Sequence, residues 1–131
     1  MEKDKNQTES IRESKLEFNE EVSTSIVEDL EKIPKGTNGF VVIKGPNIGE
    51  KFLLSKAEIP IGRSPESDIF LDDITVSRKH AVLEKTGQGF KIKDVESLNG
   101  TYVNGKRVDD LLLQNGDRIQ IGKYVFLYFT L

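Results

Sequence analysis

The sequence contains no cysteine and no tryptophan, and its only histidine is His80. Without cysteine the chain cannot form a disulfide framework, a thiolate metal site or a catalytic thiol. One histidine falls short of the four Cys or His ligands that structural zinc prefers, so we expect no metal and no cofactor. No apolar run approaches the roughly 20 residues that span a bilayer, and the N-terminal residues have no apolar core of a secretory signal. We therefore expect a cytoplasmic protein without a membrane partner.

Charge is distributed unevenly along the chain. Residues 1–35 contain 6 basic and 10 acidic side chains, whereas residues 36–131 contain 13 basic and 12 acidic ones. Nucleic-acid binding needs a basic face, and an acidic tail on a nearly neutral body does not provide one. We expect no nucleic-acid partner.

Glycine is absent from residues 1–35, and proline first occurs at Pro34. All 11 glycines follow that residue, and turn-forming residues gather around it. This change in composition predicts an acidic, flexible tail and linker over residues 1–38. It predicts a folded domain over residues 39–131.

The domain consists of short apolar segments separated by turn signals such as Asn99-Gly100, Asn104-Gly105 and Asn115-Gly116. No helical pattern lies between them, and this arrangement is typical of an all-β sandwich. The strands that the pattern predicts cover residues 40–44, 50–54, 58–62, 69–71, 81–84, 90–93, 101–103, 118–121 and 124–129.

The tail has apolar residues at helical spacing: Phe18, Val22, Ile26, Leu30 and Ile33. A helix this short is marginal in water, so the spacing favours a transient helix that frays without a partner. The alternative is a docking motif that becomes ordered when it binds.

We find no catalytic constellation and expect no enzyme. The segment Gly45–Lys51 lacks the adjacent Gly-Lys and the following Ser or Thr of a phosphate-binding loop. His80 has no recognisable nucleophile setting and no second histidine with which to share a metal. The acidic pairs Asp72-Asp73 and Asp109-Asp110 are interpreted as solvated turn residues.

Polar side chains instead gather in three strand-edge segments, at residues 62–64, 76–80 and 97–105. Together these segments supply two arginines, a lysine, a serine hydroxyl and asparagine amides. Arginine offers a planar fork of donors to a phosphate, and serine adds a short neutral donor. An asparagine amide can pair with the backbone of an extended peptide. The combination favours binding of a phosphorylated peptide.

Four motifs in this order resemble the forkhead-associated (FHA) domain: Ile61–Ser64, Ser77–His80, Leu98–Gly105 and Asn115–Ile119. The resemblance covers about residues 39–129. It implies an eleven-stranded β-sandwich that recognises phosphothreonine in extended peptides and has no catalytic activity.

The resemblance also implies roles for individual residues. Arg63 and Ser77 match the phosphate ligands of the family, and Arg78 matches a further contact at the apex. Asn99 matches the residue that holds the peptide backbone, with Leu98 beside it.

A further five residues match positions that select the ligand or shape the loops. Thr75 lies where the family reads the third residue after the phosphothreonine, and its short neutral side chain is compatible with an aliphatic residue there. Gly62, His80, Gly100 and Asn104 match positions that shape loops, so we interpret His80 as a brace for the loop that carries Ser77.

In the tail, Thr24 follows acidic residues and precedes the aliphatic Val27 by three positions, as a ligand for the pocket would. This layout resembles the small actinobacterial FHA regulators of 2-oxoglutarate metabolism. In that family a Ser/Thr protein kinase phosphorylates a tail threonine, which the domain then binds. The tail departs from the family pattern because Ser23 replaces the first of two threonines and Ile26-Val27 replaces an aliphatic–aromatic pair. The metabolic target is therefore not carried over.

We expect Thr24 to be the phosphosite, with Ser23 and Ser25 as alternatives. The expected partners are phosphothreonine-containing proteins or the phosphorylated tail itself. Two other readings stay open: a tail that is a solvated spacer, and a phospho-independent scaffold that uses the tail as a docking helix.

Overall fold

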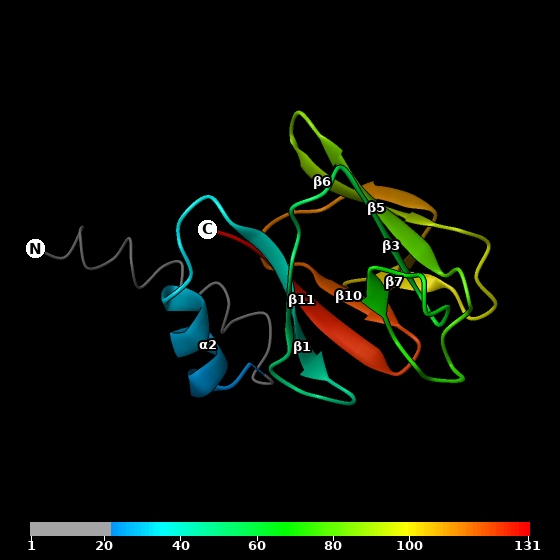
Figure 1. Cartoon of the computed structure of the whole chain (residues 1–131), viewed down its shortest axis with the longest axis horizontal. Helices are drawn as coiled ribbons and strands as arrows, with labels where there is room; N and C mark the ends of the chain where they lie inside the picture. The colour runs from blue at the N-terminus through cyan, green and yellow to red at the C-terminus, as the bar shows by residue number, and fades with distance from the viewer. Residues whose placement is uncertain (1–21) are drawn as a thin grey trace, which may run out of the picture.

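Eleven strands follow one helix in the computed structural model, which describes residues 22–131 (Figure 1). The helix is α2 (Thr24–Glu31). The strands are β1 (Asn38–Lys44), β2 (Lys51–Leu53), β3 (Glu58–Gly62), β4 (Ile69–Phe70), β5 (Ala81–Thr86), β6 (Gly89–Asp94), β7 (Thr101–Val103), β8 (Lys106–Val108), β9 (Asp110–Leu112), β10 (Arg118–Ile121) and β11 (Tyr124–Thr130). The predicted eleven-stranded, all-β class is confirmed.

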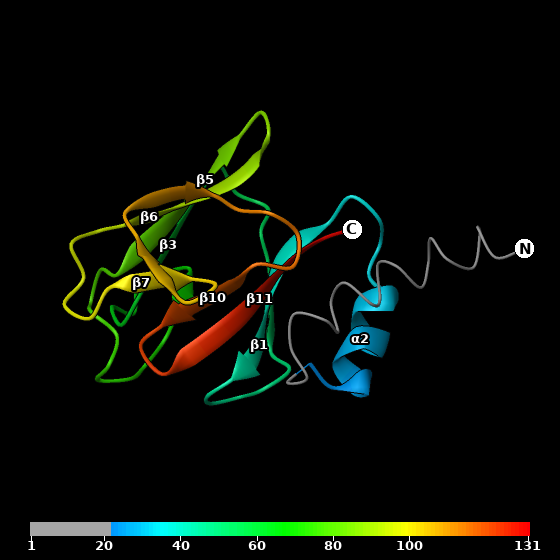
Figure 2. The same ribbon diagram turned by 180° about the vertical axis from the view of Figure 1, so that it is seen from behind.

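The strands form two sheets that stack as a sandwich (Figure 2). One has six strands in the order β2-β1-β11-β10-β7-β8, and the other has five in the order β4-β3-β5-β6-β9. The paired strands run antiparallel except β3 and β4, which are parallel. Within residues 22–131, no helix is long and apolar enough to cross a membrane.

The main core lies between the two sheets, where alternate residues of each strand point inward. In β5, for example, Ala81 and Leu83 are buried, whereas Val82 and Glu84 on the other face are half-buried. Aromatic rings fill the centre, with the Phe40 and Phe126 centroids 5.2 Å apart and Tyr128 edge-on to Phe40. The rigid sandwich that results fixes the ends of the loops.

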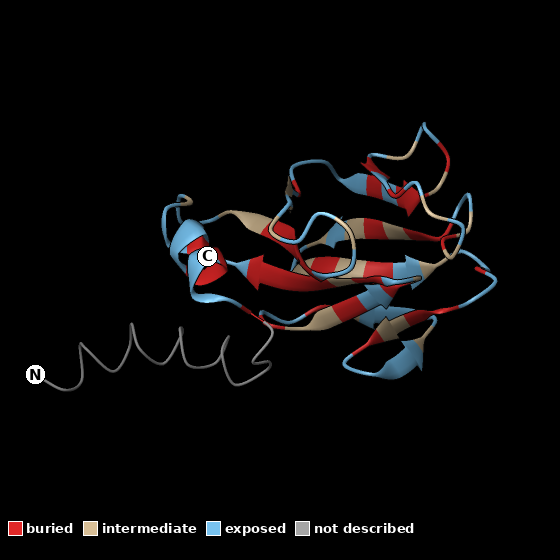
Figure 3. Ribbon diagram, turned by 90° about the horizontal axis from the view of Figure 1, so that it is seen from below, coloured by how far each residue is buried: buried red, intermediate tan, exposed pale blue. Residues whose placement is uncertain are grey.

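A second core lies on the outer face of the six-stranded sheet, where α2 covers β1 and β11. Its residues are Val22, Ile26, Val27, Leu30, Val41, Ile43, Leu127 and Phe129. Figure 3 shows buried residues on α2 where the helix meets the sheet. Burying one apolar side chain of this size stabilises the packed state by about 1.5–3 kcal/mol, so the four buried side chains of this segment together hold the helix on the sheet.

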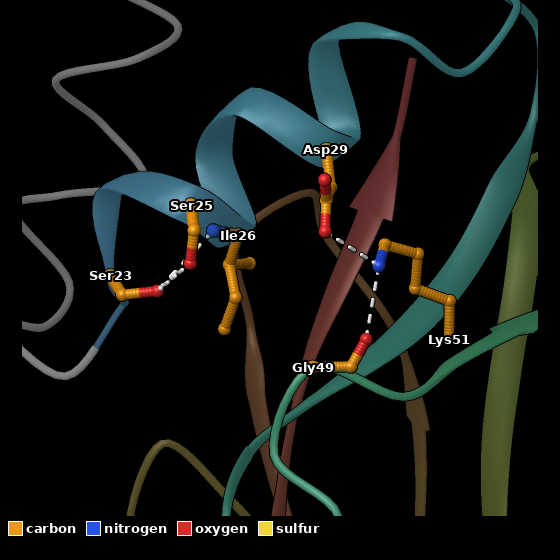
Figure 4. Close-up of polar contacts among 6 residues, drawn as sticks. All are labelled: Ser23, Ser25, Ile26, Asp29, Gly49 and Lys51. Carbon is orange, nitrogen blue, oxygen red and sulfur yellow. Dashed lines mark hydrogen bonds and ion pairs between the residues drawn. The ribbon is translucent and has the colours of Figure 1, made fainter.

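Polar contacts fix both ends of α2 (Figure 4). Ser23 caps the helix by accepting a hydrogen bond from the Ile26 amide at 3.3 Å. Farther along, Asp29 forms an ion pair with Lys51 of β2 at 3.1 Å. After the helix, the Gly36 amide donates to the Leu131 carbonyl, which ties the linker to the end of β11.

The tail therefore differs from the sequence-based expectation of a helix that frays without a partner. Residues 24–31 are helical as the spacing indicated, but the partner is the outer face of the same chain's sheet. Phe18, the first apolar residue of the spacing pattern, lies outside the described residues, as does the rest of the tail up to residue 21.

Candidate functional site

The predicted ligand residues lie in three loops: residues 63–68 between β3 and β4, 71–80 between β4 and β5, and 95–100 between β6 and β7. Backbone hydrogen bonds join the first two loops, from the Arg63 amide to the Ser77 carbonyl (3.0 Å) and from the Ser64 amide to the Arg78 carbonyl (3.1 Å). The Leu98 amide joins the third by donating to Ser77 Oγ at 2.9 Å. The folded sandwich thus brings together segments that are far apart in the sequence.

His80 links two of these loops from inside the protein, where its side chain is fully buried. The Ser77 amide donates to its Nδ1 at 3.1 Å, and its Nε2 lies 2.9 Å from the Gly100 carbonyl. Because Nδ1 accepts, Nε2 must carry the proton and donate to Gly100, so the ring is neutral. Burial lowers the pKa of His80, which agrees with that protonation state. Through these two hydrogen bonds His80 joins the loop that carries Ser77 to the loop that carries Gly100.

The buried imidazole predicts a loss of stability in mild acid. The folded state lowers the pKa of His80 from its ordinary value of 6.5, so the unfolded chain binds the proton more readily. The contribution of neutral His80 to the free energy of unfolding is complete above pH 6.5 and is lost as the pH falls through the folded-state pKa. We expect the urea unfolding free energy to drop between pH 7 and pH 5 more steeply than in His80→Gln, which lacks the titrating group. Equal pH profiles for the two proteins would contradict a buried, neutral His80.

Asp94, at the end of β6, anchors the third loop and was not predicted from the sequence. Its carboxylate accepts from Ser97 Oγ at 2.6 Å and from Thr101 Oγ1 at 2.7 Å. Ser97 Oγ in turn accepts from the Gly100 amide at 2.9 Å. Burial would raise the pKa of Asp94, but the hydrogen bonds from Ser97 and Thr101 outweigh it and hold the pKa below its ordinary value. The spacing of Asp94, Ser97 and Thr101 was the available signal.

The site keeps several donors for an anion. Ser77 Oγ accepts from Leu98, so its own hydroxyl proton remains available. Arg63 Nε donates to the Val76 carbonyl at 3.0 Å, which orients the guanidinium and leaves its terminal N–H groups. Arg78 is exposed. Within residues 22–131 neither arginine forms an ion pair with a carboxylate, so both charges can attract an anion.

A cavity of about 440 Å³ lies beside these donors, lined by Thr75, Asn99, Gly100, Tyr102, Gln120, Gly122 and Lys123. Asn99 Nδ2 donates to the Thr75 carbonyl at 3.0 Å, which closes the gap between two loops. The Asn99 side-chain oxygen and second amide proton remain for a ligand. The cavity can therefore receive a peptide that runs past Asn99.

The Thr75 hydroxyl is fully engaged at the edge of this cavity. It donates to Asp73 and accepts from the Lys123 amide at 3.0 Å. Hydrogen bonds from Thr75 hold the pKa of Asp73 below its ordinary value, and Lys123 pairs with that carboxylate at 3.0 Å. Thr75 therefore has no spare hydroxyl proton with which to attract an acidic side chain.

Two large apolar side chains protrude from the same loops, Ile74 at 92% exposure and Leu98 at 85%. Leu98 was predicted from the sequence as a neighbour of the ligand, whereas Ile74 was missed. Isoleucine next to a threonine in a loop gives no distinctive signal. Their exposure beside the cavity favours an apolar contact with a bound peptide.

Gly62 lies where two loops meet, and a side chain would not fit there. A Cβ at this position would overlap the backbone carbonyl of Arg78, and it would also lie within 3.1 Å of the Ser77 carbonyl. We expect Gly62→Ala to destabilise the fold by about 1–3 kcal/mol and to displace the loop that carries Ser77.

Gly87 is the matched control for that substitution, because a Cβ there meets no atom within 4 Å. Gly87→Ala should leave the urea unfolding midpoint nearly unchanged, whereas Gly62→Ala should lower it. Equal midpoints for the two variants would mean that the contact at Gly62 does not constrain the loops.

Two of the predicted sites lie apart from the three loops. Asn104 is in the turn between β7 and β8, where its side chain bonds the Arg118 amide and the Asp117 carboxylate, each at 3.0 Å. Thr24 is the first residue of α2 and, like Ser23 and Ser25, it is exposed. In Figures 1 and 2, α2 lies at the end of the sandwich opposite the loops that precede β5 and β7.

Comparison with known proteins identifies the fold and its relatives. A family model described as FHA domain matches residues 59–122. The chain is 49% identical over 100 residues to the oxoglutarate dehydrogenase inhibitor of Corynebacterium glutamicum, covering 76% of this chain and 70% of that protein. This chain belongs to the FHA domain family.

Further relatives and solved structures support the same family assignment. The glycogen accumulation regulator GarA of Mycolicibacterium smegmatis is 50% identical over 104 residues, covering 79% of this chain and 66% of GarA, just under two thirds. A solved structure from a study of phosphothreonine-dependent FHA domain interactions aligns with a TM-score of 0.67 at 27% identity, covering 72% of this chain and 97% of that one. The resemblance to small actinobacterial FHA regulators is thereby confirmed.

Proposed function

We propose that this FHA protein is a non-catalytic signalling module that binds phosphothreonine in a peptide. The observation that carries the proposal is the set of donors on two hydrogen-bonded loops: the Ser77 hydroxyl, the oriented Arg63 fork and the exposed Arg78. A phosphate near −2 charge at neutral pH is the natural ligand for such a set. Asn99 beside the cavity is the residue that holds the peptide backbone.

The ligand is expected to carry an aliphatic residue three positions after the phosphothreonine. Thr75 offers no hydroxyl proton to an acidic side chain, and Lys123 is already paired with Asp73. Apolar contact with Ile74 or Leu98 remains. Preference for phosphothreonine over phosphoserine rests on one methyl group, which is worth about 10–200-fold in discrimination.

The tail of the same chain contains such a ligand. Thr24 is exposed to a kinase, and Val27 follows it by three residues. Phosphorylation of Thr24 by a Ser/Thr protein kinase then lets the domain, residues 39–131, bind its own tail and exclude other partners. Because relatives include proteins named oxoglutarate dehydrogenase inhibitor, a cytoplasmic enzyme of 2-oxoglutarate metabolism is the first partner to test.

Calorimetric titration of the unmodified full-length chain tests the ligand class. The titrants are peptides of residues 20–28 in three forms: phosphorylated on Thr24, phosphorylated on Ser23, and unmodified. We expect one-to-one binding of the Thr24 phosphopeptide alone. Equal binding of the unmodified peptide would overturn phosphothreonine recognition and would favour the phospho-independent scaffold.

The scaffold alternative has one supporting observation, the exposure of Ile74 and Leu98. Against it, α2 occupies the outer apolar face of the sheet, where a constitutive partner would otherwise dock. Dependence on Arg63 separates the two functions, because a scaffold that uses apolar contacts does not need that charge.

A further inference from the structure

We infer that docking of α2 on the sheet and binding of phosphorylated Thr24 at the loops are mutually exclusive, so that α2 restrains closure of the site by the tail. The inference rests on the proposed function and adds its regulation. Its basis is that the residues which would enter the site are already part of another interface.

Val27 is the residue concerned most directly. In the structure it is 4% exposed and packed in the α2–sheet core with Ile26, Val41 and Leu127. As the third residue after phosphorylated Thr24, it would have to lie at Thr75 instead. One side chain cannot occupy both places.

The two places are also distant from each other. The Lys123 amide, directly before β11, donates to Thr75 at the loops, whereas the residues of β11 that pack in the α2–sheet core are Val125, Leu127 and Phe129. At about 3.4 Å per residue, these residues lie roughly 7–20 Å along the strand from Lys123. Because α2 lies at the end of the sandwich opposite the loops (Figures 1 and 2), phosphorylated Thr24 has to leave its docked position to reach them.

Undocking of α2 also converts residues 24–31 into the extended backbone that binding at the loops requires. An eight-residue helix is unstable alone, so its helical state depends on the sheet. When Leu30, which is fully buried, leaves the sheet, residues 24–31 lose their helical structure together. Docked helix and free extended tail thus form a two-state element, and only the second state is competent to bind.

The competition sets how strongly the tail occupies the site. The apparent affinity of the phosphorylated tail is reduced by the fraction of molecules in which α2 is undocked. A substitution that weakens docking without altering residues 24–27 should therefore tighten closure. Leu30 meets this condition, because it lies outside the ligand segment and contributes only to the α2–sheet core.

The test uses the full-length chain with and without phosphothreonine at position 24, titrated with a labelled phosphopeptide of residues 20–28. The ratio of the two dissociation constants measures closure by the tail. We expect Leu30→Ser to raise this ratio about tenfold over wild type. Glu28→Ser is the control, because Glu28 is exposed and its loss lowers helix propensity by a similar amount without removing packing.

A second variant protects the test against misfolding of Leu30→Ser. Lys51→Ala removes the ion pair with Asp29 from the β2 side and leaves the tail and the loops unchanged. It should raise the ratio about twofold, as expected for an exposed ion pair. Hydrogen exchange provides the direct readout: the Val27 amide, bonded to the Ser23 carbonyl at 3.1 Å, should lose protection when Thr24 is phosphorylated.

The outcomes separate this inference from the function beneath it. Equal ratios in Leu30→Ser and Glu28→Ser, or a Val27 amide that stays protected in the closed chain, overturn the inference alone. Absence of phosphopeptide binding by the unmodified wild-type chain overturns the proposed function and the inference with it.

Discussion

Replacement of Arg63 by alanine should reduce affinity for the Thr24 phosphopeptide by about 100-fold or more. The side chain is fixed by its bond to the Val76 carbonyl, and no carboxylate within residues 22–131 neutralises it. Losing one partner of a close charge pair costs about 2–5 kcal/mol, which corresponds to this loss of affinity. Calorimetry on the full-length variant measures the effect directly.

Two further variants separate geometry from charge. Lys106→Ala removes one exposed positive charge from β8, which lies outside the three loops, and should change the affinity less than about twofold. Arg63→Lys keeps the charge but loses the planar fork, so we expect an intermediate affinity. If Arg63→Ala and Lys106→Ala weakened binding equally, binding would depend on net charge and not on a defined phosphate site.

Phosphorylation of Thr24 in the full-length chain should weaken binding of an external phosphopeptide by about 100-fold. A tail tethered through a short linker has an effective concentration near millimolar, which predicts about 1,000-fold competition against a micromolar site. Docking of α2 opposes closure and lowers this figure. Competition titration of the phosphorylated and unmodified chains measures the difference.

The alternative to internal closure is exchange between two molecules, in which the tail of one binds the site of another. Sedimentation of the phosphorylated chain at several concentrations separates these cases. A mass that stays monomeric supports internal closure, and a mass that doubles as concentration rises contradicts it. An unchanged affinity for the external peptide would contradict closure of either kind.

Most of the fold could be predicted from the sequence because its turn residues are explicit. Asn-Gly pairs and apolar segments marked nine strands in the right places. β8 and β9 came only from the resemblance to the FHA family, since both are three residues long and largely polar or exposed. Strands of that length, with no alternating apolar residues, give no periodic signal.

The position of α2 could not be predicted from the tail alone, because its stability comes from the sheet. The relevant signal was in the strands. β1 and β11 contain continuous apolar runs instead of alternating ones, as in the segment Phe40–Ile43. Continuous runs indicate strands that are covered on both faces. In the tail, the helical spacing of Val22, Ile26 and Leu30 provides the apolar face that packs on these strands.

Within the site, the sequence located the residues that carry chemistry but not those that hold them. Arg63, Ser77 and Asn99 follow from motifs whose members lie within a few positions of each other. Asp94 had a local signal in the nearby Ser97 and Thr101, whereas Lys123 was missed because its contact with Asp73 depends on how distant segments are brought together. Tertiary hydrogen bonds of this kind have no fixed sequence spacing.

The central claim, that the three loops bind phosphothreonine, is tested most directly by an NMR titration of the labelled full-length chain with the Thr24 phosphopeptide of residues 20–28. We predict that the amide resonances of Ser77, Leu98 and Gly100 shift on binding, while those of Val41 and Leu127 under α2 do not. Shifts confined to the outer face of β1 and β11, with the loop resonances unchanged, would contradict the account.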